Sequence, residues 1–150
     1  MIKKMALGFL LILVVIQFIR PPKNISDAPA NNDIGMVYEI PSAVHGILKE
    51  KCYDCHSNNT RYPWYFNIQP VGWWMYKHIQ DGKNELNFSE FKTYSAKKAT
   101  HKLEETVELV REKEMPLKSY LWMHPEAKVS ADEEKILTEW IASLGVKVDG

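Results

Sequence analysis

The first feature of the hydrophobic pattern is an apolar run of fifteen residues, from Met5 to Ile19, without a charge. Lys3 and Lys4 precede the run, and Arg20 follows it. We expect residues 1–20 to form an N-terminal hydrophobic helix, although the run falls between the length of a signal-peptide core and that of a full membrane span. No small-x-small cleavage pattern closes the run, so an uncleaved membrane anchor is favoured over a removed signal, with the domain outside the cytoplasm.

Residues 21–38 interrupt this hydrophobic pattern. Proline, asparagine and glycine recur in the segment, and neither a helical nor a strand period is present. It therefore predicts a linker. Residues 39–150 then form one domain of ordinary size.

Within this domain, apolar positions recur at the spacing of α-helices. A first helix should begin at Pro41-Ser42 and lead into Cys52, a second should span 71–81 and stop at Gly82, and a third should span 96–113 with Ser95 as N-cap. A last helix should begin at the capping box Ser130-x-x-Glu133 and end at Gly145. We expect the apolar face of the last helix to cross the first one. Because no strand pattern of any length is present, the predicted fold class is all-α.

Both cysteines of the chain lie in one motif, Cys52-Tyr53-Asp54-Cys55-His56. This C-x-x-C-H spacing is typical of a c-type haem attachment site. Two thiols three residues apart can add to the two vinyl groups along one edge of a porphyrin. The histidine directly after the second thiol can present its Nε2 atom to the iron. The motif therefore predicts one covalently bound haem c.

The two cysteines allow three other interpretations, and each conflicts with a feature of the sequence. A thioredoxin-like redox pair follows a strand, whereas the residues before Cys52 have a helical pattern. A structural zinc site needs four protein ligands, and no second C-x-x-C or H-x-x-x-H supplies the fourth. A disulfide between Cys52 and Cys55 would close a short, strained loop of little value to stability.

A candidate for the second protein ligand of the iron is Met115, which precedes Pro116. Proline disfavours the helical region for the residue before it, so Met115 should lie in an extended loop that can aim a thioether at a metal. The alternatives are methionines and histidines elsewhere in the chain: Met123, His124, His45, Met75 and His78.

Composition and charge narrow the functional classes. The net charge is zero at pH 7, which argues against a nucleic-acid partner. No nucleophile–base pair and no phosphate loop is present, so we expect no catalytic residues of the acid–base kind.

The aromatic stretch 62–66 could wrap the haem edge or cover ordinary core, and Arg61 could bind the propionates. Thiols that await haem are handled in an oxidising compartment, which places the domain on the extracytoplasmic face of a bacterial inner membrane.

Several segments resemble class I cytochromes c: a helix that leads into Cys52-x-x-Cys55-His56, then Pro70-Val71-x-Trp73, Met115-Pro116 and an aromatic-bearing last helix. More narrowly, about residues 40–145 resemble the bacterial haem-binding-domain family of membrane-anchored monohaem proteins. The segments that carry this resemblance are Tyr62-Pro63-Trp64-Tyr65, Pro70-Val71-Gly72-Trp73-Trp74, Met115-Pro116-Leu117-x-x-Tyr120 and His124-Pro125-x-Ala127.

The resemblance implies a small cytochrome c-like helical domain wrapped around one haem. It makes Cys52 and Cys55 the thioether links, His56 the proximal iron ligand and Met115 the distal ligand.

The resemblance also implies a hydrogen bond behind the proximal ligand. Pro70 would offer its carbonyl to the Nδ1–H group of His56, which fixes the ring and tunes the iron. Because Pro70 lacks the preceding glycine that is usual in class I cytochromes, Pro63 is a rival acceptor.

Together these expectations predict a membrane-tethered carrier of single electrons that serves redox partner proteins. Iron with histidine and methionine ligands has no open position, which suits electron transfer. Two alternatives remain. One is a haem-based sensor or gas-binding protein with a labile or absent sixth ligand. The other is a peroxidase-like enzyme, in which a polar group such as His124 or Arg111 would face an open distal position.

Overall fold

The computed structural model describes residues 1–148 of the chain. Over these residues the regular structure consists of seven α-helices and four short 3-10 helices, without a strand. The predicted all-α fold class is therefore confirmed. The α-helices are α1 (Ile2–Ile16), α2 (Ser42–Lys51), α3 (Tyr53–His56), α4 (Val71–Glu85), α5 (Ala96–Arg111), α6 (Lys118–Leu121) and α7 (Ala131–Ser143). The 3-10 helices are η1 (Ile34–Met36), η2 (Trp64–Asn67), η3 (Phe88–Thr93) and η4 (Pro125–Ala127).

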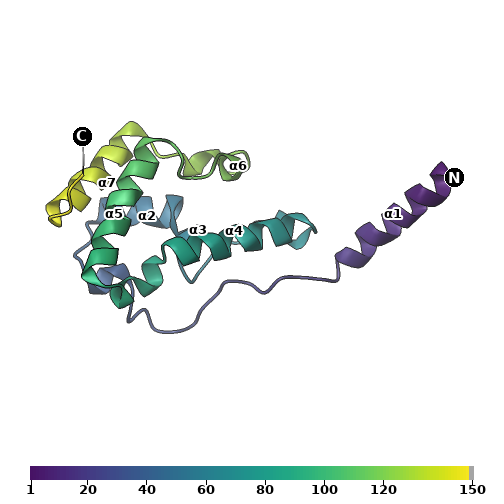
Figure 1. The fold of residues 1–150 in the computed structure, drawn as a ribbon, viewed down its shortest axis with the longest axis horizontal. Coiled ribbons are helices and arrows are strands. Elements are labelled where there is room, and N and C mark those ends of the chain that lie inside the picture. The colour runs from purple at the N-terminus through teal and green to yellow at the C-terminus, as the bar shows by residue number, and fades with distance from the viewer. Residues whose placement is uncertain (149–150) are drawn as a thin grey trace.

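Helix α1 lies apart from the other helices, at one end of the molecule (Figure 1), and none of its residues is buried. Its 15 residues give a length of about 22 Å, whereas the hydrocarbon core of a bilayer is about 30 Å thick. Within residues 1–148, no helix is both long enough and apolar enough to cross a membrane. The expected N-terminal helix is present, but the expectation that residues 1–20 span a membrane is not supported.

The segment predicted to be a linker touches the domain at two buried residues. Ile34 is fully buried in the main core, where η1 begins. The side-chain amide of Asn24 donates to the carbonyl of Ser57 at 2.8 Å and to the Thr60 hydroxyl at 2.9 Å. The Asn24 carbonyl also accepts from the Thr60 backbone N–H at 3.0 Å. Residues 21–38 therefore do not form a free linker along their whole length, because Asn24 and Ile34 are held against the domain.

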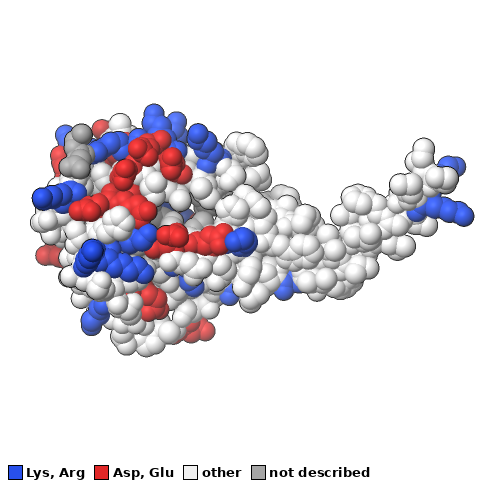
Figure 2. Space-filling model, viewed as in Figure 1, with Lys and Arg blue, Asp and Glu red and all other residues white. Residues whose placement is uncertain are grey.

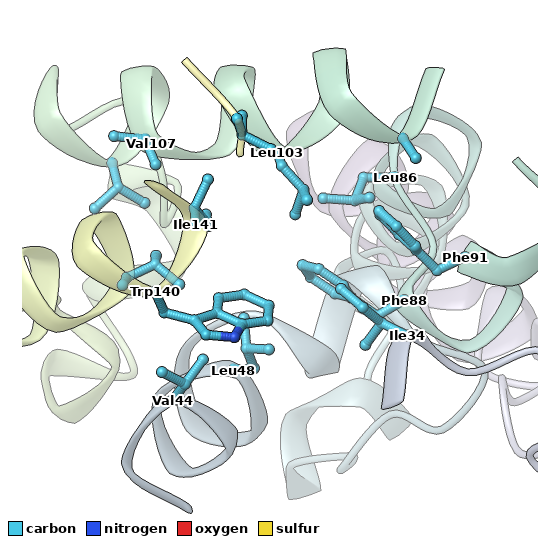
Figure 3. Close-up of a cluster of buried hydrophobic side chains, with 14 residues drawn as sticks. Ile34, Val44, Leu48, Leu86, Phe88, Phe91, Leu103, Val107, Trp140 and Ile141 are labelled. Carbon is cyan, nitrogen blue, oxygen red and sulfur yellow. The ribbon is translucent and has the colours of Figure 1, made fainter. Parts of the chain in front are cut away.

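The main core lies where α2, α5 and α7 meet, as Figure 3 shows. Its buried side chains include Val44 and Leu48 of α2, Leu103 and Val107 of α5, and Leu137, Trp140 and Ile141 of α7. The expected contact between the first and last helices is confirmed. Burial of these apolar groups, at roughly 25 cal/mol per Å² removed from water, is the main force that holds the three helices together.

Two helix starts follow directly from local hydrogen bonding. The Ser130 hydroxyl accepts from the Glu133 backbone N–H at 3.2 Å, and the Glu133 carboxylate accepts from the Ser130 backbone N–H at 2.8 Å. This confirms the predicted capping box of α7. Ser95 caps α5 as predicted by accepting from the Lys98 N–H at 3.3 Å. Helix α5 ends at Arg111, slightly before the predicted end.

Candidate haem site

The C-x-x-C-H motif forms a short helix of its own, directly after α2. Helix α2 ends at Lys51, Cys52 lies at the junction, and α3 carries Cys55 and His56. The His56 N–H donates to the Cys52 carbonyl at 3.0 Å, which closes the turn between the first cysteine and the histidine. Both cysteines are free and half-buried. The motif is thus presented by one tight helical turn on the end of a packed helix.

A glycine of α4 lets this turn approach the rest of the domain. The predicted helix 71–81 is wrong at its end, because α4 continues through Gly82 to Glu85. A Cβ atom at Gly82 would lie 3.0 Å from the Cys55 carbonyl oxygen and 3.3 Å from the Cys55 Cβ atom. Gly82 is therefore not a helix terminator here, since it provides the space in which α3 packs against α4.

A cavity of about 340 Å³ opens beside this turn. Cys52, Cys55 and His56 contribute to its wall, and so does Met115 from the segment after α5. Most of the exposed wall is apolar. The apolar residues that line it are Leu86, Phe88, Leu109, Val110, Leu117 and Val129. The structure thus brings the four predicted haem-holding side chains to one cavity.

The proximal-ligand candidate His56 is held through its Nδ1 atom. This atom lies 2.9 Å from the carbonyl oxygen of Leu86, the residue that follows α4. Burial lowers the pKa of His56, so the ring is neutral near pH 7. A neutral ring that donates its Nδ1–H to a carbonyl leaves Nε2 unprotonated, which is the form that ligates a metal.

The predicted role of Pro70 in this hydrogen bond is wrong. Pro70 is the N-cap of α4, and its carbonyl accepts from the Trp74 backbone N–H at 3.1 Å. The rival Pro63 carbonyl accepts from the Phe66 N–H, also at 3.1 Å. The physical reason is the direction of α4, whose C-terminal end lies beside α3. The carbonyl of Leu86, at that end, reaches His56 instead.

The two thiols are protonated at neutral pH. Burial raises the pKa of Cys52 to about 12, with the neighbouring Cys55 as a further cause. Burial likewise raises the pKa of Cys55 to about 11, with a further contribution from the negative charge of Asp54. These are the environments of buried thiols rather than of activated thiolates, which form next to cations or helix N-termini. They therefore give no support to a thioredoxin-like redox pair.

The candidates for the second iron ligand are distributed unevenly around the cavity. Met115 lies outside any helix, as predicted, and lines the cavity. His78 also lines it, but its Nδ1 atom lies 2.9 Å from the Trp74 carbonyl. Both ring nitrogens of His124 are engaged, by the Tyr65 hydroxyl at 2.6 Å and by a carboxylate at 3.0 Å. The remaining candidates are exposed or packed outside the cavity wall: His45, Met75 and Met123.

A second set of contacts around Asp54, inside the motif, was not predicted. The Asp54 carboxylate accepts from the Arg61 guanidinium at 3.1 and 3.2 Å and from the Tyr120 hydroxyl at 2.8 Å. Arg61, which the sequence offered as a group that could bind the haem propionates, is paired with Asp54. Tyr120, in α6, also lines the cavity. This contact ties the segment after Met115 to the C-x-x-C-H turn.

None of residues 62–66, the aromatic stretch, is among the described residues that line this cavity. Its Tyr62 ring packs on the Phe66 ring with centroids 4.2 Å apart, and Phe66 is buried. Within this stretch, Phe66 therefore belongs to the core, whereas Trp64 is exposed.

Two lysines that the sequence did not single out also line the cavity. The side chain of Lys102 is 12% exposed, and its Nζ atom lies 2.6 Å from Glu105 and 3.1 Å from Glu85. The side chain of Lys51 is 8% exposed and pairs with Glu133 at 3.5 Å. Nothing in their local pattern distinguishes them from the other lysines of the chain, and only the fold places them at the cavity.

The residues around the cavity fit a haem. An apolar wall suits the faces of a porphyrin, two thiols three residues apart suit its vinyl edge, and a neutral imidazole and a thioether are ligands that haem iron accepts. The fold and the site therefore define a small all-α haem protein.

Comparison with known proteins agrees with this class. The sequence model of a family described as haem-binding domain matches residues 11–143. The chain belongs to the haem-binding-domain family, which confirms the resemblance seen in the sequence and the expectation that it binds haem. No curated protein and no solved structure matches the chain.

Proposed function

We propose that this chain binds one haem covalently, through Cys52 and Cys55, and carries single electrons with His56 and Met115 as iron ligands. The observation that supports this most is the convergence of the four side chains on one cavity, although Met115 lies in a different segment from the motif. When bound, the iron supplies reversible one-electron chemistry, and a methionine ligand raises its potential relative to a second histidine.

The cysteines would act as the covalent links. Each thiol would add across one vinyl group, with a C–S bond formed and the thiol hydrogen placed on the neighbouring vinyl carbon. This addition releases nothing and needs no oxidant. A fixed helical turn supports it, because the turn holds both sulfur atoms and the histidine in one arrangement.

His56 would act as the proximal ligand, and Leu86 as the group that orients it. The Leu86 carbonyl, 2.9 Å from Nδ1, keeps the proton on Nδ1 and directs Nε2 away from that bond. Such a hydrogen bond fixes the ring and raises the basicity of the ligand.

The geometry supports an electron carrier better than a peroxidase-like enzyme. That enzyme would need a polar group such as His124 or Arg111 at an open distal position. Neither residue is among the described residues that line the cavity. A sensor or gas-binding role would instead require a Met115 ligand that is absent or labile.

We also propose that the protein works at the extracytoplasmic face of a bacterial inner membrane. The exposed apolar helix α1 supports attachment to the membrane, and redox proteins at the same surface would be its partners. Thiols reserved for haem are consistent with an exported, oxidising compartment.

The test of covalent attachment uses full-length protein matured in a host that assembles c-type cytochromes. After denaturation in alkaline pyridine, the haemochrome spectrum should stay with the polypeptide, and the intact mass should include one haem. A bare polypeptide mass with released pigment would contradict the proposal.

The test of the ligand set uses Met115→Ala, with Met123→Ala as its control because Met123 is exposed and outside the cavity. The parent protein should be low-spin with a weak sulfur-to-iron band. Met115→Ala should become high-spin or lose much of its potential, whereas Met123→Ala should not change. An unchanged Met115→Ala spectrum would transfer the role to another residue, with His78 the first to test. A parent protein that is high-spin and binds carbon monoxide readily would favour the sensor.

A further inference from the structure

Five large apolar side chains are exposed together at one end of the domain. Trp64 in η2 is 72% exposed, and Trp122 and Met123, just after α6, are 85% and 57% exposed. Ile68 and Val71, between η2 and the start of α4, are 44% and 38% exposed. We call these five residues the aromatic end. A contiguous apolar surface of this kind marks an interaction site in a soluble domain, whereas single exposed apolar residues need no explanation.

Contacts between two segments show that the aromatic end is one surface. The Tyr65 hydroxyl and His124 Nε2 lie 2.6 Å apart, which brings η2 beside the segment after α6. Trp64 precedes Tyr65 and Met123 precedes His124, so these exposed side chains come from neighbouring pieces of backbone. The exposed residues of η2 and of the segment after α6 therefore lie side by side although they are far apart in sequence.

Helix α1 leaves the domain from this same end. The Gln17 side chain donates to the Gln69 carbonyl at 3.0 Å and accepts from the Gln69 N–H at 2.9 Å. The Trp73 indole N–H donates to the Ile19 carbonyl at 2.7 Å. These three hydrogen bonds join the end of α1 to the start of α4, beside Ile68 and Val71.

Charged side chains are sparse at this end on the face that Figure 2 shows, although Lys118 and the exposed Glu126 flank Trp122 and Met123 in the sequence. Figure 2 shows the red and blue side chains gathered on the body of the domain, while the end near α1 and the length of α1 are almost entirely white. Between Met5 and Ile19 no residue carries a charge, and Lys3 and Lys4 lie in the first turn of α1, at the N-terminus (Figure 1).

We propose that the aromatic end rests in the interfacial layer of a lipid bilayer, as a second membrane contact beside α1. A bilayer is the occupant that suits both surfaces. Helix α1 is apolar and exposed all round, so it needs apolar surroundings on every side, whereas a protein groove would cover one face. Tryptophan is enriched at the membrane–water interface, where its ring meets headgroups and acyl chains. This inference rests on the proposed membrane location and adds the domain's own contact to it.

This contact orients the haem cavity. Val71 lies at the N-terminal end of α4, and Asp81 and Glu85, which line the cavity, lie at the C-terminal end. The helix has 15 residues, so its ends are about 21 Å apart. Along α4 the cavity therefore lies toward the end of the helix away from the membrane contact, whereas on the α6 side Tyr120, which also lines the cavity, is only two residues before Trp122.

The first experiment measures binding of full-length holoprotein to vesicles of phosphatidylcholine with phosphatidylglycerol by flotation. The double variant Trp64→Glu/Trp122→Glu should reduce the partition coefficient by about tenfold or more, because two interfacial rings are replaced by charges. The matched control is Ile136→Glu, since Ile136 is an exposed apolar residue of α7, outside the aromatic end. Equal partition of the double variant and the parent would overturn the proposal, because α1 alone would then account for binding.

The second experiment identifies the occupant directly. Hydroxyl-radical footprinting with and without vesicles should show slower oxidation of Trp122 and Met123 on vesicle binding, while exposed His101 of α5 keeps its rate. Sedimentation velocity of the same proteins tests for a second copy of the chain. A dimer that the double variant disrupts, with unchanged vesicle binding, would overturn the proposal in favour of self-association. Haem content and spectra of the variants report separately on the proposed function, because neither tryptophan lines the cavity.

Discussion

Replacing Tyr120 by phenylalanine tests whether the contact with Asp54 holds the segment after Met115 against the C-x-x-C-H turn. The substitution keeps the ring and removes the hydroxyl that donates to the Asp54 carboxylate at 2.8 Å. A hydrogen bond to a charged group contributes about 1.5–3 kcal/mol. Tyr120 is only half-buried, and Asp54 keeps its two hydrogen bonds from the Arg61 guanidinium. We therefore expect the low end of that range, a loss of about 1.5 kcal/mol.

Thermal unfolding of the holoprotein, followed by circular dichroism, measures this loss. For a chain of this size, about 1.5 kcal/mol corresponds to a fall in Tm of about 5 °C. Tyr76→Phe is the matched control, because the Tyr76 hydroxyl makes no hydrogen bond within residues 1–148 and the residue lies on α4. If Tyr120→Phe and Tyr76→Phe lower Tm equally, the hydroxyl does not clamp the two segments and the reasoning is wrong.

The same variant makes a prediction about alkaline pH. Burial and the charge of Asp54 raise the pKa of Tyr120 in the folded protein above the value of about 10 in an unfolded chain. A raised folded-state pKa gives stability that is complete below about pH 10 and is lost as pH rises above that value. The parent should therefore lose Tm above pH 10 more steeply than Tyr120→Phe. Tyr53 also has a raised pKa but is present in both proteins, so the difference reports on Tyr120. Parallel pH curves would contradict this assignment.

Three further substitutions test individual positions. Gly82→Ala places a methyl group 3.0 Å from the Cys55 carbonyl oxygen. It should lower haem incorporation, and it should lower the free energy of unfolding by about 1–3 kcal/mol. Normal haem content and Tm would show that α3 moves to accommodate the methyl group. Gly46→Ala in α2 has no described heavy atom within 4 Å of its new Cβ atom. It should raise the free energy of unfolding, measured in urea, by about 0.5–1 kcal/mol. A lower free energy of unfolding would contradict the inference that the new methyl group meets no neighbour. Ser130→Ala removes the cap of α7 and should cost about 1 kcal/mol in the same assay, and no change would mean that the cap is replaced by solvent.

The helices that the sequence predicted well are those whose signals are local. The α7 start follows from Ser130 and Glu133, which are three residues apart and bond to each other's backbone. The α5 start follows from Ser95 in the same way. The end of α4 was predicted wrongly because glycine is common directly after the last residue of a helix, and the sequence pattern places Gly82 at such a position. Its actual role depends on Cys55, a residue far away in sequence, and no local pattern contains that contact.

The site was predictable to the extent that its chemistry is local. Cys52, Cys55 and His56 sit in one turn, and their spacing alone indicates haem attachment. The contact between Asp54 and Tyr120 joins positions 66 residues apart. Any tyrosine of the chain could have supplied that hydroxyl, so only the fold identifies Tyr120.

The predicted role of the Pro70 carbonyl as the acceptor from His56 conflicts with helix geometry. The carbonyl of an N-cap residue already accepts the first hydrogen bond of its helix, and the prediction of a helix from Val71 made Pro70 that residue. The Pro70 carbonyl indeed accepts from Trp74. Leu86 follows the last residue of α4, so its carbonyl has no partner four residues on in the same helix and is available to another group. The side chain that uses it is His56, and the position at which α4 ends therefore determines which residue orients the His56 ring.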